Sequence, residues 1–129
     1  MSIQVKKTAA MMVGEAKTKV ENLTPEQVMR ELEQGTLLLD LRDSEERRQN
    51  GVIEGALHIP RGMLEFRADP TSAYHNTALT PERRVILHCA SGGRSALAAD
   101  TLRQMGYENV AHLDGGLNAW KEQDLPVEA

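Results

Sequence analysis

Four short apolar runs alternate along the chain with segments that carry helical signals, and this alternation restricts the possible fold. The runs occupy residues 36–41, 56–59, 85–88 and 110–113. A continuous apolar run of this length suits a strand that is covered on both faces, as in a parallel sheet. Strands that alternate with helices favour a parallel sheet between helical layers. We therefore predict one α/β domain, whose ligands bind beyond the carboxyl ends of the strands.

The segments between the runs begin and end where helices usually do. Thr24, Pro25 and Gln27 form a helix start with a Thr-x-x-Gln capping box, and Gly35 ends this helix. Further helices are predicted over residues 9–13, 44–49, 63–66, 95–105 and 117–122.

Residues 67–81 contain turn signals without periodicity and are predicted to form a long loop. Long loops often act as lids over a binding site. Two interpretations of residues 67–80 stay open at this point. Either Phe66, Tyr74 and His75 roof the pocket, or the loop wraps the surface.

The composition is that of an ordinary globular domain, with 40% hydrophobic and 26% charged residues. The longest strictly apolar runs are only a few residues, whereas a membrane span needs ~20. Residues 1–10 also lack the apolar stretch of a secretory signal. We therefore expect a cytoplasmic protein with no membrane partner. We divide it into an N-terminal extension, residues 1–20, and one domain, residues 21–129.

The net charge of −4 argues against a general nucleic-acid binder, and four aromatic residues are too few for a base-stacking platform. Residues 1–20 hold four lysines and one glutamate, so the rest of the chain is its more acidic part. An anion-handling enzyme of this composition must therefore build its positive field locally.

The chain has one cysteine, Cys89, which cannot form an internal disulfide. With only scattered histidines it makes no zinc cluster, and no feature of the sequence requires a metal or an organic cofactor. Cys89 is therefore either a buried inert thiol or a nucleophile. Its sequence neighbours decide between the two.

Cys89 comes at the carboxyl end of the third predicted strand, and the stretch Ala90-Ser91-Gly92-Gly93-Arg94 joins it to the helix that begins near Ser95. Small residues and two adjacent glycines allow backbone N–H groups to turn inward as an anion-binding nest, at which the helix points its positive end. Arg94 adds a cation. A thiol in such a cradle is expected to be largely thiolate near neutral pH. The alternative is a tight turn whose glycines only permit the bend.

Two kinds of group transfer use a nucleophilic cysteine in such a cradle. In phosphate transfer the loop holds three oxygens, and loops of the His-Cys-x5-Arg type place five residues between cysteine and arginine. Here His88-Cys89 and Arg94 are separated by four residues. A tighter ring suits a single sulfur atom better, so the spacing favours sulfur transfer.

Four stretches of the sequence, the cysteine loop among them, form a longer pattern in this order. They are Asp40-Leu41-Arg42, Gly51-Val52-Ile53-Glu54-Gly55-Ala56-Leu57-His58-Ile59-Pro60, Cys89-Ala90-Ser91-Gly92-Gly93-Arg94-Ser95-Ala96 and Leu113-Asp114-Gly115-Gly116-Leu117-Asn118-Ala119-Trp120. Over about residues 21–127, the chain thereby resembles the rhodanese-like sulfurtransferases in their single-domain form.

The resemblance implies a parallel five-stranded sheet flanked by helices on both faces, and a ping-pong reaction. A small anionic sulfane donor such as thiosulfate would load Cys89 as a persulfide, and cyanide, a thiol or an acceptor protein would remove the sulfur. Cys89 and Arg94 would be catalytic. The backbone amides of Ala90, Ser91, Gly92, Gly93 and Ser95 would hold the donor and stabilise the persulfide.

Two other function classes stay open. A cysteine phosphatase or arsenate reductase would use the same kind of cradle, although the four-residue spacing speaks against it. A non-catalytic module would sense oxidants or bind a partner, and a sensor would form sulfenic acid or mixed disulfides faster than it accepts sulfur. Because there is no second cysteine, such a sensor would need an external thiol to discharge Cys89.

Polar residues near the predicted strand ends are further candidates. Asp40 is interpreted as a structural hydrogen-bond acceptor, and Arg42 either pairs with an acidic side chain or extends the positive field. Arg61 follows a strand directly and is a candidate for substrate binding. His88 should point away from the Cys89 side chain, because neighbouring strand residues alternate. The remaining assignments are structural or solvated roles for His58, His75 and His112, a core anchor for Trp120 and a solvated face for residues 45–48.

Overall fold

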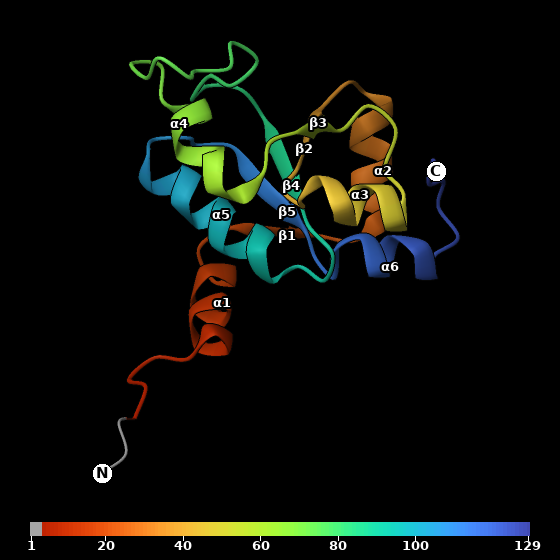
Figure 1. Cartoon of the computed structure of the whole chain (residues 1–129), viewed down its shortest axis with the longest axis horizontal. Helices are drawn as coiled ribbons and strands as arrows, with labels where there is room; N and C mark the ends of the chain where they lie inside the picture. Colours follow the sequence, from red (N-terminus) through yellow and green to blue (C-terminus); the bar gives the residue numbers. More distant parts are fainter. Residues whose placement is uncertain (1–3) are drawn as a thin grey trace.

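A sheet of five parallel strands forms the centre of the molecule. The computed structural model describes residues 4–129 and orders the strands β1-β5-β4-β2-β3 (Figure 1). The strands are β1 (Glu21–Leu23), β2 (Leu37–Asp40), β3 (Leu57–His58), β4 (Val85–His88) and β5 (Val110–Leu113). Because every pairing is parallel, the carboxyl ends of the strands meet at one edge of the sheet.

Helices cover both faces of this sheet. They are α1 (Ala9–Lys17), α2 (Pro25–Glu33), α3 (Ser44–Asn50), the 3-10 helix η1 (Arg61–Met63), α4 (Leu64–Ala68), α5 (Gly93–Gln104) and α6 (Gly116–Glu122). In Figure 1, α4 and α5 lie on one side of the strands, and α2, α3 and α6 lie on the other. The predicted α/β fold with a parallel five-stranded sheet is confirmed. Within residues 4–129, no helix is long and apolar enough to cross a membrane.

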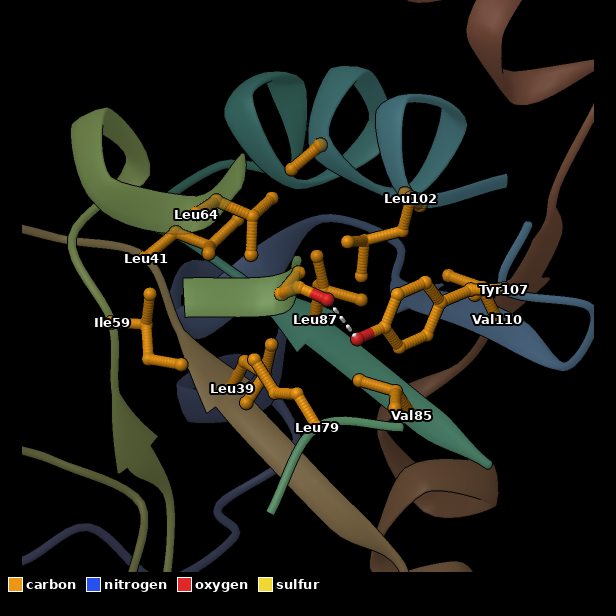
Figure 2. Packing of buried hydrophobic residues seen from close by; sticks show 13 residues of the cluster. Leu39, Leu41, Ile59, Leu64, Leu79, Val85, Leu87, Leu102, Tyr107 and Val110 are labelled. Carbon is orange, nitrogen blue, oxygen red and sulfur yellow. Dashed lines mark hydrogen bonds between the residues drawn. The ribbon is translucent and has the colours of Figure 1, made fainter. Parts of the chain in front are cut away.

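Alternate residues of the central strands pack against opposite helical layers. In β2, Leu38 packs in the layer of α2 and α6, whereas Leu39 packs in the layer of α4 and α5. Figure 2 shows the second layer, in which the Tyr107 hydroxyl donates a hydrogen bond to the Ala68 carbonyl at 2.7 Å. Both faces of β2 and β4 are therefore buried, which explains why their sequences are apolar without alternation.

The predicted starts of α2 and α3 agree with the structure. The Thr24 hydroxyl accepts the Gln27 N–H at 3.2 Å, and the Gln27 side chain accepts the Thr24 N–H at 2.9 Å, which completes the capping box. Asp43 caps α3 with a similar reciprocal pair. Helix α5 begins at Gly93, two residues earlier than predicted, and the left-handed Gly92 (φ 103°) is its N-cap.

One strand lies outside the four apolar runs. β1 is an edge strand that pairs with β5, and its burial is limited to Leu23. Because the side chains of Glu21 and Asn22 are exposed, no apolar run marks this strand in the sequence. Before it, the helix predicted over residues 9–13 continues to Lys17 and packs against α5.

The long loop after α4 lies away from the carboxyl ends of the strands. Residues 69–84 enter β4 at its amino end, whereas Cys89 follows its carboxyl end (Figure 1). Leu79 is buried in the core, and its carbonyl lies 2.8 Å from His75 Nε2. The side chains of Phe66 and Tyr74 are exposed. The loop therefore wraps the surface, and the interpretation of residues 67–80 as a lid is wrong.

Candidate active site

Cys89 lies directly after β4, at the bottom of the loop that residues 89–95 form, and is 1% exposed. Its Sγ atom accepts hydrogen bonds from the Gly92 N–H at 3.2 Å and the Ser95 N–H at 3.4 Å. Helix α5, which is 12 residues long, begins within this loop and directs its positive end at the sulfur. The sulfur is therefore surrounded by groups that stabilise negative charge.

Helix α6 holds the loop from its other side. The N–H groups of Leu117 and Asn118 donate to the carbonyls of Cys89 and Ala90, at 2.9 and 3.0 Å. Gly116 precedes them with a φ of 60°, and a Cβ at this position would lie 2.6 Å from both carbonyl oxygens. Only glycine therefore fits where α6 meets the loop.

Arg94, expected to be catalytic, is paired with an acidic side chain. Its Nη1 and Nη2 atoms donate to the two carboxylate oxygens of Glu46 on α3, at 2.7 and 2.8 Å. This bidentate pair restrains the guanidinium at the start of α5, and the Arg94 hydrogen bonds lower the pKa of Glu46 to about 2. The expectation that residues 45–48 only form a solvated face is therefore wrong for Glu46.

A buried ion-pair cluster lies at the end of β2, beside β4. Asp40 accepts hydrogen bonds from Arg42 Nε at 3.0 Å, Arg42 Nη2 at 2.8 Å and Arg47 Nε at 3.0 Å. Burial alone raises the pKa of Asp40, but the Arg42 hydrogen bonds and the neighbouring positive charges outweigh it and hold this pKa below its ordinary value. Of the two alternatives for Arg42, the structure contains the ion pair. Arg47 also joins this cluster, so the solvated-face interpretation fails for it too.

Two other candidates contact different groups. Arg61 Nη1 bonds Glu65 at 2.9 Å, and Nη2 bonds the Thr101 hydroxyl at 3.4 Å, in the third turn of α5. These contacts hold Arg61 along the side of α5, whereas the cysteine loop includes the first residues of this helix. His88 Nδ1 lies 3.2 Å from the carbonyl oxygen of Cys89, so this histidine contacts the backbone of the cysteine and not its sulfur.

Two polar residues from neighbouring strands reach the loop through Ser95. The Ser95 Oγ atom lies 3.7 Å from Cys89 Sγ and 2.9 Å from Nδ1 of His112 on β5. His112 Nε2 lies 2.7 Å from Oδ1 of Asn22 on β1. The sequence pattern predicts only a structural or solvated role for His112 and does not single out Asn22. The contact of His112 with the loop depends on the pairing of β4 with β5. In this pairing His112 is the register partner of Leu87, two residues before Cys89.

Comparison with known proteins identifies the family. The family model of the rhodanese-like domain matches residues 24–123. The chain belongs to the rhodanese-like family. Its relatives include a sulfurtransferase of Allochromatium vinosum, 36% identical over 93 residues (72% of this chain and 78% of the relative). Another is the thiosulfate sulfurtransferase GlpE of Haemophilus influenzae, 31% identical over 111 residues (84% and 94%). The resemblance found in the sequence motifs is thus confirmed.

Solved structures share the rhodanese-like fold. A protein of unknown function from Rhodopseudomonas palustris, described as a possible tyrosine phosphatase, is 35% identical, with a TM-score of 0.93 and coverage of 99% of both chains. The human single-domain sulfurtransferase TSTD1 is 25% identical, with a TM-score of 0.71, and the match covers 81% of this chain and 97% of that one. Coverage of 99% means that the first similarity extends over helix α1 as well as the sheet.

The rhodanese-like loop combines a buried sulfur, two N–H donors aimed at it and the positive end of a helix. Residues 90–93 carry no charged side chain, and Arg94 is restrained by Glu46. The arrangement suits attack by the Cys89 sulfur on an electrophilic atom, followed by stabilisation of charge next to the sulfur. Among residues 4–129, no group of three or more His, Cys, Asp or Glu side chains is placed to hold a metal ion.

Neutralising Glu46 is expected to weaken the acid dependence of stability in this rhodanese-like domain. The folded-state pKa of Glu46 is about 2, against an ordinary value of 4.5. The contribution of Glu46 to the free energy of unfolding is therefore fully present above about pH 4.5 and is lost as the pH falls towards 2. Because the pair is partly exposed, Glu46→Gln should cost about 1 kcal/mol or less at pH 7 and flatten the acid limb.

Urea unfolding at pH 7 and at pH 3 measures this difference. Glu45→Gln is the matched control, since Glu45 neighbours Glu46 and pairs with the exposed Arg48. If the wild type and Glu46→Gln lost the same stability between the two pH values, the coupling of Glu46 to Arg94 would be refuted.

Proposed function

We propose that the chain is a sulfurtransferase that carries a sulfane sulfur as a persulfide on Cys89. The observation that supports this most is the position of Cys89 Sγ, which accepts the N–H groups of Gly92 and Ser95 where α5 begins. A persulfide is an anion at this place, and donors fixed before the reaction stabilise developing charge without reorganisation. The family supports the same conclusion, because its relatives from Allochromatium vinosum and Haemophilus influenzae are named sulfurtransferases.

The first half of the reaction loads the cysteine. The Cys89 thiolate attacks the outer sulfur of thiosulfate and forms a new S–S bond, while the original bond between the two sulfur atoms breaks. Its electron pair leaves with sulfite, and the outer sulfur stays on Cys89 as an anionic persulfide. The loop amides stabilise this sulfur, so that one transfer is divided into two easier steps.

The second half returns the thiolate. Cyanide or a thiolate attacks the terminal sulfur of the persulfide, the S–S bond to Cys89 breaks, and Cys89 keeps the electron pair. The acceptor must come from outside the chain, because Cys89 is its one cysteine. A cycle that depends on reduced thiols fits the cytoplasm. We propose thiosulfate as the donor, and cyanide, a small thiol or an acceptor protein as the acceptor.

Phosphate transfer is the competing reaction, since one similar structure is described as a possible tyrosine phosphatase. Two features favour sulfur. Four residues separate Cys89 from Arg94, and the guanidinium of Arg94 is occupied by Glu46.

Two parallel assays of the purified protein separate the reactions. One measures thiocyanate formed from thiosulfate and cyanide, and the other measures nitrophenol released from p-nitrophenyl phosphate. We expect turnover in the first assay and background in the second. Phosphatase turnover without thiocyanate formation would overturn the proposal.

A further inference from the structure

We propose that His112, acting through the Ser95 hydroxyl, takes the proton of the Cys89 thiol, so that the resting site holds a thiolate–imidazolium pair. His112 is a positioning residue in this scheme, because it touches the sulfur only through Ser95. The inference rests on the proposed function in one respect, namely that Cys89 is the reacting group.

The geometry supplies a continuous path between the two titrating groups. Cys89 Sγ lies 3.7 Å from Ser95 Oγ, which lies 2.9 Å from His112 Nδ1. Cys89 is 1% exposed, and Ser95 and His112 are 0% exposed. Because bulk water does not reach these side chains, a proton that leaves the sulfur has the Ser95 hydroxyl as its neighbouring acceptor.

Asn22 fixes which ring nitrogen of His112 accepts the proton. The Asn22 amide nitrogen donates to the carbonyls of Lys17 and Val20, at 2.9 and 3.2 Å. Its Oδ1 therefore faces His112 Nε2 at 2.7 Å and acts as the acceptor. Nε2 must then carry the hydrogen, which leaves the lone pair of the neutral ring on Nδ1, facing Ser95. The Gly92 carbonyl, 3.2 Å from Ser95 Oγ, is the competing acceptor for the hydroxyl.

The buried surroundings of His112 do not stabilise an imidazolium by themselves. Burial lowers the pKa of His112, Asp114 raises it and Lys17 lowers it again. Lys17 at the end of α1 and Asp114 after β5 also pair with each other at 2.9 Å. An isolated imidazolium is therefore disfavoured here, and the ring keeps a proton because the Cys89 thiolate lies at the other end of the path.

The proton transfer is balanced without another reactant. The Cys89 S–H bond breaks as its proton forms a bond to Ser95 Oγ, and the original Ser95 hydroxyl proton moves to His112 Nδ1. Ser95 remains a neutral hydroxyl, the sulfur becomes a thiolate and the ring becomes an imidazolium. The net charge of the site does not change.

The test is the rate at which iodoacetamide alkylates Cys89 between about pH 5 and pH 10, followed by intact mass. His112→Asn keeps an oxygen near the position of Nδ1, which accepts the Ser95 hydroxyl but takes no proton. Ser95→Ala removes the path itself. His75→Gln is the matched control, since His75 bonds a backbone carbonyl in the loop far from Cys89.

We expect His112→Asn and Ser95→Ala to move the midpoint of the alkylation profile upward by about one pH unit, which makes alkylation about tenfold slower near pH 6. The control His75→Gln should follow the wild-type profile. Profiles that coincide with the wild type, or that move downward, would overturn the inference.

A second measurement on the unaltered sequence covers the case in which a variant does not fold. The ¹⁵N resonances of the His112 ring report whether Nδ1 is protonated. We expect a protonated Nδ1 near neutral pH and a neutral ring after Cys89 is alkylated, because alkylation removes the thiolate. A ring that is neutral both before and after alkylation would overturn the inference. Neither measurement uses a sulfur donor, so failure of this inference is distinguishable from failure of the proposed sulfur transfer.

Discussion

Replacing Cys89 with serine is expected to reduce the rate of thiocyanate formation from thiosulfate and cyanide to the uncatalysed background, a loss of about 10³-fold or more. The serine hydroxyl is a far weaker nucleophile than a thiolate and cannot carry a persulfide. The loop should keep its shape, because the Cys89 and Ala90 carbonyls stay bonded to the N-terminus of α6. Steady-state turnover of the folded variant measures the effect.

The control for this prediction lies at the other end of β4. Tyr74 is exposed in the loop that wraps the surface, so Tyr74→Ala should keep turnover within about twofold of the wild type. Cys89→Ser with a substantial part of the wild-type turnover would contradict the assignment of Cys89 as the sulfur carrier.

Replacing Arg42 with alanine is expected to destabilise the fold by about 3–5 kcal/mol, a large share of the stability of a small domain. The change leaves the Asp40 carboxylate, which is 0% exposed, without the guanidinium that holds it at 2.8 and 3.0 Å. It also removes the donor to the Gly51 carbonyl. Arg47 remains as a partner for Asp40, but its guanidinium supplies one hydrogen bond in place of the bidentate pair.

Urea unfolding of Arg42→Ala at pH 7 measures this cost. Arg48→Ala is the control, since Arg48 pairs on the surface with Glu45, and its unfolding midpoint should stay close to that of the wild type. A cost below about 1 kcal/mol for Arg42→Ala would show that Asp40 does not depend on this pair.

The strands that are buried on both faces were predictable from the sequence, because a short continuous apolar run is typical of such a strand. β4 and β5 occupy the predicted residues, and β2 lies within its predicted run. The edge strand β1 was not predictable from hydrophobicity, since two of its three residues are exposed and its partner β5 lies about 90 residues later. Pairing over such a distance leaves no local pattern.

The candidate active site also combines residues that are close in sequence with residues that only the fold brings together. Cys89 and the glycines of its loop are adjacent in sequence, so their chemistry could be inferred from spacing alone. Glu46 reaches Arg94 from another element. His112 reaches Ser95 from β5, and Asn22 reaches His112 from β1. Charged residues such as Glu46 look like a solvated helix face when only neighbours in sequence are compared. These contacts form only in the folded chain, where helices and strands that are separate in sequence meet near the carboxyl ends of the strands.

Intact mass of the reduced protein after incubation with thiosulfate is the most direct test of the persulfide on Cys89. We expect a gain in mass of one sulfur atom, located on the peptide that contains Cys89 and lost when cyanide is added. An unchanged mass with thiosulfate and with other sulfane donors, in a protein whose Cys89 still reacts with iodoacetamide, would contradict this expectation.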